Sequence, residues 1–208
     1  MILTDEDIKQ LSHLIQNTDI LILSDEVYEH IIYDGQNHLS MAKYPVLRER
    51  SFIVASFGKL FHNTGWKMGY CVAPAWLMTE FRKVHQFLVF SVNTPVQYAL
   101  ADFMSDESTY LDLKEFYQQK RDTFRNLMLN TRFDLLPCLG SYFQCVQYSR
   151  ISDEHDGDFA KRLTKEAKVA GIPVSAFYNR RSDDHVLRFC FAKKQETLEK
   201  AVERLIKV

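Results

Sequence analysis

Short apolar runs that end in polar residues are the feature that most restricts how this chain folds. They are "DILILSDE" at 19–26, "SFIVAS" at 51–56 and "MGYCVA" at 68–73. A continuous apolar run of this length is typical of a strand buried on both faces of a parallel sheet. We therefore expect three parallel-type strands of an α/β sheet, although three are few for a sheet that is covered on both faces.

Helical patterns surround these runs. The stretch "TDEDIKQLSHLI" has Thr4 as a predicted N-cap, acids in its first turn, and apolar Ile8, Leu11, Leu14 and Ile15 at helical spacing. Further helical patterns run from residue 76 to about 90 and from 97 to 104, and "VNTPV" interrupts them. These elements predict a first domain over residues 1–105.

A composition change at "MSDEST" marks the start of a second part, which we assign to residues 106–208. It opens with "YLDLKEFYQQKRDTFRNLMLN", an extended helix that could link two domains. The elements that follow are a strand at 141–148, an acidic loop at 152–158, a helix at 158–170, strands at 172–177 and 185–192, and a helix at 194–207. This order predicts a small α+β domain.

Composition excludes several classes of function. The 208 residues are 46% hydrophobic with a formal net charge of -1, which gives no reason to expect a nucleic-acid partner. No run approaches the ~18 apolar residues of a membrane span, and the acidic start "MILTDEDIKQ" does not resemble a signal peptide. We expect a cytoplasmic protein that binds neither nucleic acid nor membrane.

Metal sites and disulfides are not suggested either. The four cysteines, Cys71, Cys138, Cys145 and Cys190, are far apart and form no CxxC pair, so we expect reduced core residues. The histidines show no HExxH spacing. "GKL" lacks the frame of a phosphate-binding P-loop, and "SDEHDGD" lacks the acid spacing of a calcium loop. We predict no metal.

A lysine at the end of an apolar strand raises the question of reactivity. Lys59 lies in "SFGKLFHNTGWKMGY", between Gly58 and a second glycine further on. Lysine is usually a solvated surface charge, but this position could hold a reactive amine. Asp25 and Tyr28 in "SDEVYEH" also follow a buried strand, where open α/β sheets place ligand sites, although "SDE" alone reads as a simple turn. An acid, a phenol and a lysine together suggest a carbonyl cofactor.

Five motifs occur in one order along the chain: "SDEVYEH", "SFGKLFHNTGWKMGY", "FSVNTPVQ", "LGSYF" and "VLRFCFA". In this order and spacing they resemble the C-terminal half of a class I/II pyridoxal-phosphate-dependent aminotransferase of fold type I. The forms "TGWK" and "FSVNTP" are most similar to the branch that includes kynurenine, glutamine and methionine aminotransferases. The resemblance implies part of a large-domain α/β sheet followed by a small α+β C-terminal domain.

The resemblance also implies roles around the cofactor, pyridoxal 5'-phosphate. Lys59 would bind it covalently and then move the proton of the substrate Cα. Asp25 would keep the pyridine nitrogen protonated, and Tyr28 would hydrogen-bond the phenolic oxygen of the ring. Ser56 and Lys67 would contact the phosphate. Much of the wider family has arginine at the position of Lys67, and lysine offers a point charge instead of a bidentate fork.

Three residues of the second part would face the substrate. The resemblance implies that Arg188 pairs with the substrate α-carboxylate, although a surface arginine at a strand edge would read the same. Because it lies between Leu187 and Phe189 in an apolar strand, Arg188 points away from the face that those two share. Gly140 and Tyr142 would shape the substrate cavity, although a glycine turn before a strand would look alike.

The substrates that the resemblance implies are an amino acid of methionine, glutamine or aromatic type and a 2-oxo acid. The resemblance also implies a homodimer. The family's first half carries a glycine turn, a stacking aromatic and an "NPxG" asparagine that this sequence does not contain. We therefore expect part of an aminotransferase. Two alternatives stay open: a truncated, inactive paralogue that acts as a binding or interaction module, and a related β-lyase with the same cofactor.

Overall fold

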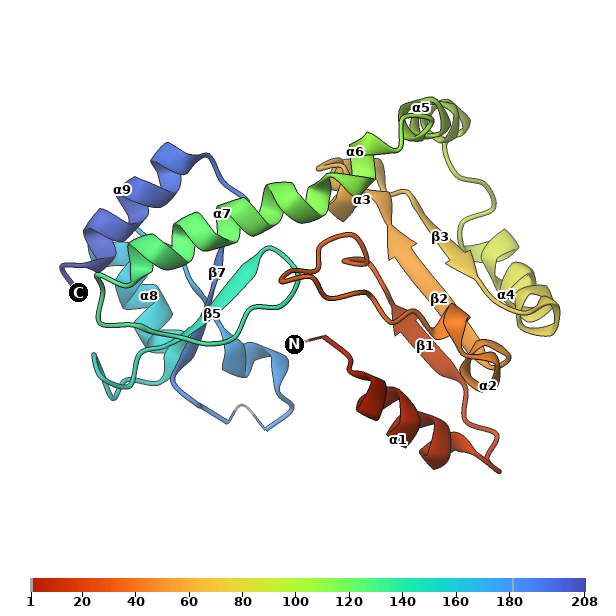
Figure 1. Cartoon of the computed structure of the whole chain (residues 1–208), viewed down its shortest axis with the longest axis horizontal. Helices are drawn as coiled ribbons and strands as arrows, with labels where there is room; N and C mark the ends of the chain where they lie inside the picture. Colours follow the sequence, from red (N-terminus) through yellow and green to blue (C-terminus); the bar gives the residue numbers. More distant parts are fainter. Residues whose placement is uncertain (1, 181) are drawn as a thin grey trace. The chain divides into compact units, whose positions relative to one another are not determined.

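The computed structural model describes residues 2–180 and 182–208 and divides between Leu113 and Lys114 into two units (Figure 1). The composition change placed the domain boundary earlier, between residues 105 and 106, and that assignment stays a prediction. The class expected from the sequence, part of an α/β sheet followed by a small α+β domain, is confirmed.

The first unit is built on a three-stranded sheet in the order β1-β2-β3. Its strands are β1 (Ile22–Asp25), β2 (Ser51–Ser56) and β3 (Gly69–Val72). β1 and β2 are parallel, as expected, but β3 runs antiparallel to β2, so the expectation of three parallel-type strands is wrong. The cause is the connection: one-turn α3 (Phe57–Leu60) and a 3-10 turn (Thr64–Trp66) provide no helix that crosses the sheet.

Burial on β1 alternates, which differs from the expectation of a strand buried on both faces. Ile22 packs against a core formed by Ile8, Ile15, Met41, Leu47 and Ile53, whereas Leu23 on the other face is 72% exposed. The core residues come from α1 (Asp5–Ile15), β2 and the segment before β2. Within the described residues, this packing reaches only one face of the strand.

Helix α1 begins as the sequence predicts. The Thr4 hydroxyl oxygen accepts from the Asp7 amide at 3.2 Å, and the Asp7 carboxylate accepts from the Thr4 amide at 2.8 Å, which forms a capping box. Ile8 and Ile15 are buried, but Leu14, expected on the same face, is exposed. The apolar stripe is therefore narrower than the sequence pattern indicates.

The remaining elements of the first unit are a 3-10 turn at Met41–Lys43, α2 (Pro45–Arg48), α4 (Ala75–Leu88), α5 (Thr94–Met104) and α6 (Ser108–Leu111). Asn93 caps α5 by accepting from the Val96 amide at 3.2 Å, so this helix begins before the predicted residue 97. Phe87 in the last turn of α4 and Phe90 just after this helix are each 85% exposed. This is a large apolar surface for one small unit.

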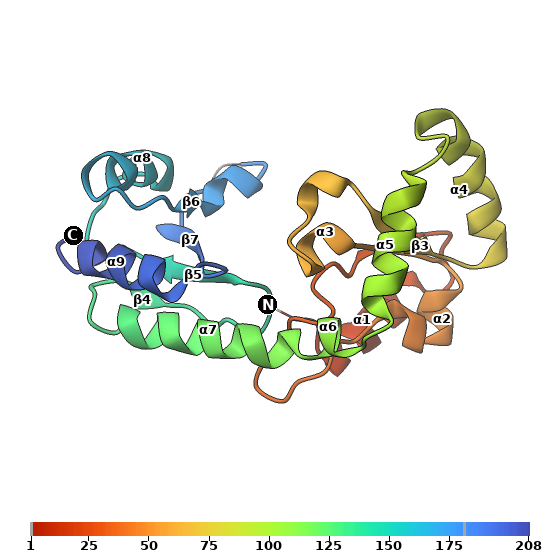
Figure 2. The same ribbon diagram turned by 90° about the horizontal axis from the view of Figure 1, so that it is seen from above.

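The second unit is a four-stranded antiparallel sheet in the order β4-β5-β7-β6 (Figures 1 and 2). Its strands are β4 (Asp134–Leu135), β5 (Phe143–Gln147), β6 (Ile172–Pro173) and β7 (Val186–Cys190). Its helices are α7 (Leu113–Met128), α8 (Asp156–Glu166) and α9 (Gln195–Leu205). Phe124 of α7 packs on Phe189 of β7, and Phe159 of α8 packs on Tyr148, so both helices are fixed by aromatic contacts with the sheet.

The segment 172–177 is not the single strand that the sequence predicts. β6 ends at Pro173, and residues Val174–Phe177 form a 3-10 turn. Proline offers no amide proton to a ladder, and both the amide and the hydroxyl of Ser175 donate to the buried carboxylate of Asp156, at 2.8 and 2.6 Å. These bonds hold the chain in a turn.

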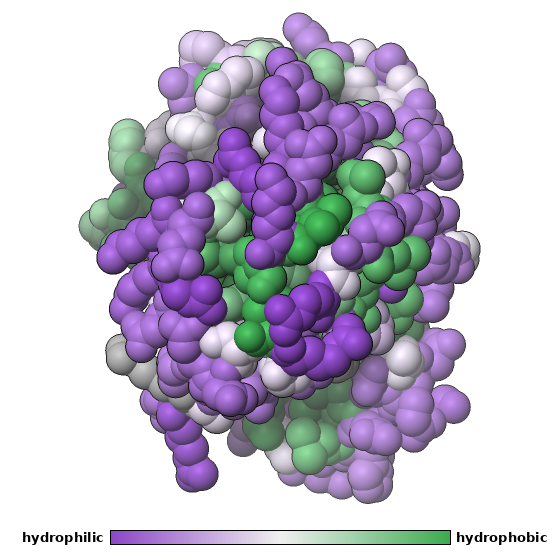
Figure 3. All heavy atoms as spheres, turned by 90° about the vertical axis from the view of Figure 1, so that its left-hand side faces the viewer, coloured by the Kyte–Doolittle hydropathy of each residue, from purple (hydrophilic) through white to green (hydrophobic). Residues whose placement is uncertain are grey.

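The outer side of the second unit carries a hollow of apolar surface among charged side chains (Figure 3). A groove of about 440 Å³ lies on this unit, lined by residues of α9 together with Phe124, Phe189 and residues 168–170. In the part of the chain that the structure describes, no helix is long and apolar enough to cross a membrane.

Candidate active site

Five of the predicted site residues lie at one edge of the first sheet. Asp25 and Ser56 are the last residues of the parallel strands β1 and β2, so their carboxyl ends meet at the same edge. Tyr28 lies in the turn that follows β1, and Lys59 lies on α3, which follows β2 directly. Lys67 is two residues before β3, whose Gly69 pairs with Ser56. The crevice at such an edge is where open α/β sheets bind ligands.

Short contacts fix the turn of helix that carries Lys59. The Ser56 hydroxyl oxygen accepts from the Gly58 amide at 3.1 Å, which caps α3. A Cβ on Gly58 would lie 2.8 Å from the Thr64 Cα, so only glycine fits there. The Thr64 hydroxyl donates to the Gly58 carbonyl at 3.1 Å. Because the Ser56 hydroxyl oxygen accepts the bond from the Gly58 amide, the hydroxyl proton of Ser56 can be donated to a phosphate.

The acid and the phenol are placed by the turn after β1. Asp25 is exposed, and its Oδ1 accepts from the Val27 amide at 3.2 Å. The turn is closed by the Glu29 amide, which donates to the Glu26 carbonyl at 2.9 Å, and by the Ile31 amide, which donates to the Tyr28 carbonyl at 2.9 Å. One carboxylate oxygen of Asp25 therefore serves the turn, and the second can accept a proton from a ligand.

Lys67 is held in a left-handed backbone conformation, with φ 53° and ψ 45°. This conformation costs a non-glycine residue roughly 1–2 kcal/mol and is common near functional sites. The neighbouring Met68 carbonyl accepts from the Phe57 amide at 3.1 Å, which ties the segment to the start of α3. The backbone next to Lys67 is thus tied to the turn that carries Lys59.

Arg188 lies between two aromatic rings on the sheet of the second unit. Its guanidinium carbon is 4.1 Å from the ring centre of Phe143 and 4.7 Å from that of Phe177. Leu187 and Phe189 are buried and Arg188 is half-buried, so the predicted alternation is confirmed. β7 lies between β5 and β6, so Arg188 is not on an edge strand.

The Nε of Arg188 is buried and has no hydrogen-bond partner among the described residues. A buried donor without a partner is costly, and a planar guanidinium that is stacked on both faces can still bind a carboxylate in its plane. The side chain therefore suits recognition of a carboxylate better than a purely structural role.

Gly140 and Tyr142 precede β5 in the same unit. The Tyr142 carbonyl accepts from the Phe191 amide at 3.0 Å, which fixes it beside the end of β7. Its ring packs on Phe143 at 4.9 Å and on Tyr117 at 5.7 Å. Tyr142 thus adjoins the phenylalanine that stacks on the arginine.

Burial, with Tyr142 and Cys190 nearby, raises the pKa of Tyr117 to about 12, so this phenol is neutral.

Comparison with known proteins identifies the family. The family model for "Aminotransferase class I and II" matches residues 1–205. The chain belongs to the class I and II aminotransferases. The resemblance inferred from the five motifs is therefore confirmed, and the fold class with it.

Several proteins of known function are similar in sequence to this chain. Methionine aminotransferase of Escherichia coli is 50% identical over 96% of this chain and 52% of its own length. Kynurenine–oxoglutarate transaminase 1 of Rattus norvegicus is 33% identical over 97% of this chain and 53% of its own length. The chain thus spans about half the length of the curated relatives it matches.

Solved structures agree. A structure from Escherichia coli that identifies a methionine aminotransferase function superposes with a TM-score of 0.96 at 47% identity, over 100% of this chain and 55% of that one. N-succinyldiaminopimelate aminotransferase from Mycobacterium tuberculosis gives 0.93 at 28% identity, over 100% and 54%.

Sequence reasoning missed three residues that contact or support the candidate site residues. Glu26 is buried beside Asp25, Phe177 stacks on Arg188, and Asp156 holds the turn that carries Phe177. An acid next to another acid gives no sign of burial in a single sequence. Phe177 was expected on a strand, where its contact with Arg188 could not be foreseen.

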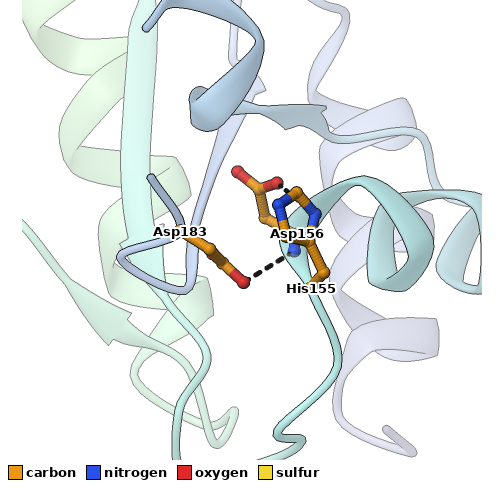
Figure 4. A group of neighbouring side chains, drawn as sticks. All are labelled: His155, Asp156 and Asp183. Atoms are coloured by element: carbon orange, nitrogen blue, oxygen red, sulfur yellow. Dashed lines mark hydrogen bonds and ion pairs between the residues drawn. The ribbon is translucent and has the colours of Figure 1, made fainter. Parts of the chain in front are cut away.

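A cluster of His155, Asp156 and Asp183 brings three potential metal ligands within 4.8 Å of one another (Figure 4). Protein donors use these atoms: Ser175 donates to both oxygens of Asp156, the Asp156 amide donates to Asp183 at 3.1 Å, and the Gly157 amide donates to His155 at 3.2 Å. The cluster fixes the start of α8.

The cysteines are free thiols. Cys138 is buried, whereas the other three are only half-buried, so the expectation of core residues holds fully for one of them. Burial raises the pKa of the Cys71, Cys138 and Cys145 thiols, which keeps them protonated at neutral pH.

Proposed function

We propose that the protein to which these residues belong is a pyridoxal-phosphate-dependent aminotransferase that moves an amino group between an amino acid and a 2-oxo acid. One observation supports the proposal: Asp25, Tyr28, Ser56 and Lys59 lie at or just after the carboxyl ends of the parallel strands β1 and β2, and Lys67 lies just before β3 at the same end of the sheet. The relatives named as methionine and kynurenine transaminases support an amino acid with a methionine-like or aromatic side chain, and the motif resemblance adds a glutamine-like one.

The residues of this edge fit the cofactor. Ser56 offers a hydroxyl proton and Lys67 a positive charge for its phosphate, Asp25 a carboxylate for a ring nitrogen, and Tyr28 a phenol for a ring oxygen. When bound, pyridoxal phosphate supplies an aldehyde for an amine and a ring that draws electrons from the substrate Cα.

Each side chain then has a defined task. Asp25 holds a proton on the ring nitrogen. Lys59 would hold the cofactor through Nζ and would take the proton from the substrate Cα. Arg188 would bind the carboxylate of the substrate, and Tyr142 packs on Phe143, one of the two rings that stack on Arg188. A homodimer and a cytoplasmic location belong to the same proposal, and the exposed apolar end of α4 supports self-association.

Chemical trapping tests the assignment of Lys59. The protein is mixed with pyridoxal phosphate, reduced with borohydride and mapped by peptide mass spectrometry. We expect the pyridoxyl group on Lys59 and its loss in Lys59→Ala, together with loss of transamination. Lys83→Ala, which removes an exposed lysine paired with Glu80, is the matched control. A pyridoxyl group mainly on another lysine would refute the assignment, and release of ammonia in place of an amino acid product would indicate a lyase.

A further inference from the structure

Glu26 is a buried carboxylate immediately after Asp25. It is 5% exposed. Its Oε1 accepts from the Ser24 hydroxyl at 2.9 Å and from the Met41 amide at 3.0 Å, and its Oε2 lies 2.7 Å from the Nε2 of His38. A buried acid with this many partners is a fixed point in the structure, because each bond would be lost together with the carboxylate.

The partners come from two places along the chain. Ser24 belongs to β1, whereas His38 and Met41 belong to the segment that returns toward β2. The carboxylate therefore closes a loop over residues 27–37, and that loop begins with the turn that bears Tyr28. The backbone of Glu26 adds to this closure: its amide donates to the Val54 carbonyl at 2.8 Å, which extends the pairing of β1 with β2.

The carboxylate is ionised at neutral pH. Burial alone raises the pKa of Glu26, but hydrogen bonds from His38, Ser40, the Met41 amide and Ser24 outweigh burial and lower it to about 2. Hydrogen bonds to a charged acceptor are about twice as strong as neutral ones. The Glu26 carboxylate, which we call the anchor, is therefore held by strong hydrogen bonds.

Geometry connects this anchor to the proposed cofactor site. Successive side chains of a strand point to opposite faces, so Ser24 and Glu26 share one face and Asp25 has the other. We propose that Glu26 is a positioning residue, which fixes the side-chain direction of Asp25 and the turn of Tyr28 from the opposite face of the strand end. The catalytic part of this inference rests on the proposed function, whereas the mechanical part does not.

Amide hydrogen exchange in a full-length enzyme that contains this chain tests the mechanical part. The informative amides are Val27, bonded to Asp25, and Ile31, bonded to Tyr28, because neither touches the Glu26 side chain. In Glu26→Ala we expect exchange at both to rise about tenfold, as for the loss of roughly 1.4 kcal/mol of local stability. A change confined to the Met41 amide would overturn the proposal.

Three variants separate positioning from general destabilisation. Glu26→Gln keeps an acceptor oxygen for Ser24 and Met41 and can face His38 in its other tautomer but loses the charge, so exchange at Val27 and Ile31 should rise less than in Glu26→Ala. Glu80→Ala removes an exposed glutamate from α4 and should change nothing at Val27. If Glu26→Ala does not fold, His38→Ala removes one bond only and should still raise exchange at Val27; exchange at the wild-type rate there would overturn the proposal.

Cofactor trapping tests the catalytic part on the same proteins. We expect Glu26→Ala to need about tenfold more pyridoxal phosphate for half-maximal labelling of Lys59, and Glu26→Gln to need less than Glu26→Ala does. Absence of labelling in the wild type would refute the proposed function, while the exchange data still decide whether Glu26 positions the turn. Equal labelling of Glu26→Ala and wild type would overturn the catalytic part.

Discussion

Arg188 shows what a single side chain contributes to substrate recognition. Its guanidinium is stacked between Phe143 and Phe177, and its Nε has no partner among the described residues. A charge-assisted bond to a carboxylate contributes about 1.5–3 kcal/mol, so Arg188→Leu should lower kcat/KM for the amino acid about tenfold to a hundredfold. Steady-state kinetics in a full-length enzyme that contains this chain measure the loss.

Labelling of Lys59 by pyridoxal phosphate and borohydride should persist in Arg188→Leu, because the arginine serves only the substrate. Arg48→Leu, which removes an exposed arginine beside Glu49, is the control and should leave kcat/KM unchanged. An unchanged kcat/KM in Arg188→Leu would show that the stacked arginine is structural.

Glu26 predicts a defined dependence of stability on pH. Its pKa is about 2 in the folded protein, below the ordinary value of 4.5. A lowered pKa stabilises the fold at pH values above 4.5, and this contribution is lost as the pH falls from 4.5 to about 2. At neutral pH it amounts to on the order of 3 kcal/mol.

The measurement compares the Tm of the wild type with that of Glu26→Gln across this range. We expect the wild type to be more stable above pH 5 and the difference in Tm to shrink as the pH falls toward 2, because Glu26 becomes protonated over this range. A difference that stays constant from pH 7 to pH 2 would contradict an ionised anchor.

Individual residues of the site differ in how far the sequence reveals them. Asp25 and Lys59 follow the ends of apolar strands, and parallel pairing brings those ends together whatever surrounds them. The contacts of Glu26 and Phe177 depend on how the chain folds back on itself. Glu26 contacts His38, 12 residues further along the chain, and Phe177 contacts Arg188, 11 residues further along. A single sequence carries no pattern for such contacts.

At the scale of elements, the 3-10 turn Val174–Phe177 connects the core of the second unit to Arg188. Ser175 donates its hydroxyl proton to the buried Asp156 at 2.6 Å, and Phe177 of the same turn stacks on the arginine. Ser175→Ala removes the hydroxyl that donates to Oδ1 of Asp156, which should lower the free energy of unfolding by about 1–3 kcal/mol.

We therefore expect Ser175→Ala to lower the Tm and to raise the KM for the amino acid in an active enzyme, because the turn that covers Arg188 is loosened. Thr164→Ala, which removes an exposed hydroxyl bonded within α8, is the control and should change the Tm much less. A lower Tm with an unchanged KM would show that the turn does not support the arginine.

Elements were predictable where local chemistry decides them. The capping box of α1 and the parallel pair β1 and β2 follow from their own residues. The antiparallel direction of β3 and the turn at 174–177 do not, because they depend on a short connection and on a buried carboxylate from another element. The apolar run before Pro74 is compatible with either strand direction.

At the scale of the whole molecule, the exposed apolar side chains and the half-length match to relatives lead to one prediction. Leu23 on the sheet is 72% exposed, and Phe87 and Phe90 beside α4 are each 85% exposed. Apolar surface of this kind is normally covered, and the relatives that carry aminotransferase names are about twice as long. A polypeptide of these 208 residues alone should therefore self-associate and bind pyridoxal phosphate weakly.

The comparison pairs this polypeptide with a chain extended to the length of the relatives. Both are titrated with pyridoxal phosphate by absorbance and assayed for 2-oxo acid formation, and their size is followed by ultracentrifugation. We expect the extended chain to be active and the 208 residues to show little or no turnover, since Lys59 and Asp25 alone do not enclose a cofactor. Equal turnover would show that the residues described here form a sufficient active site, and that the exposed apolar surface serves another purpose.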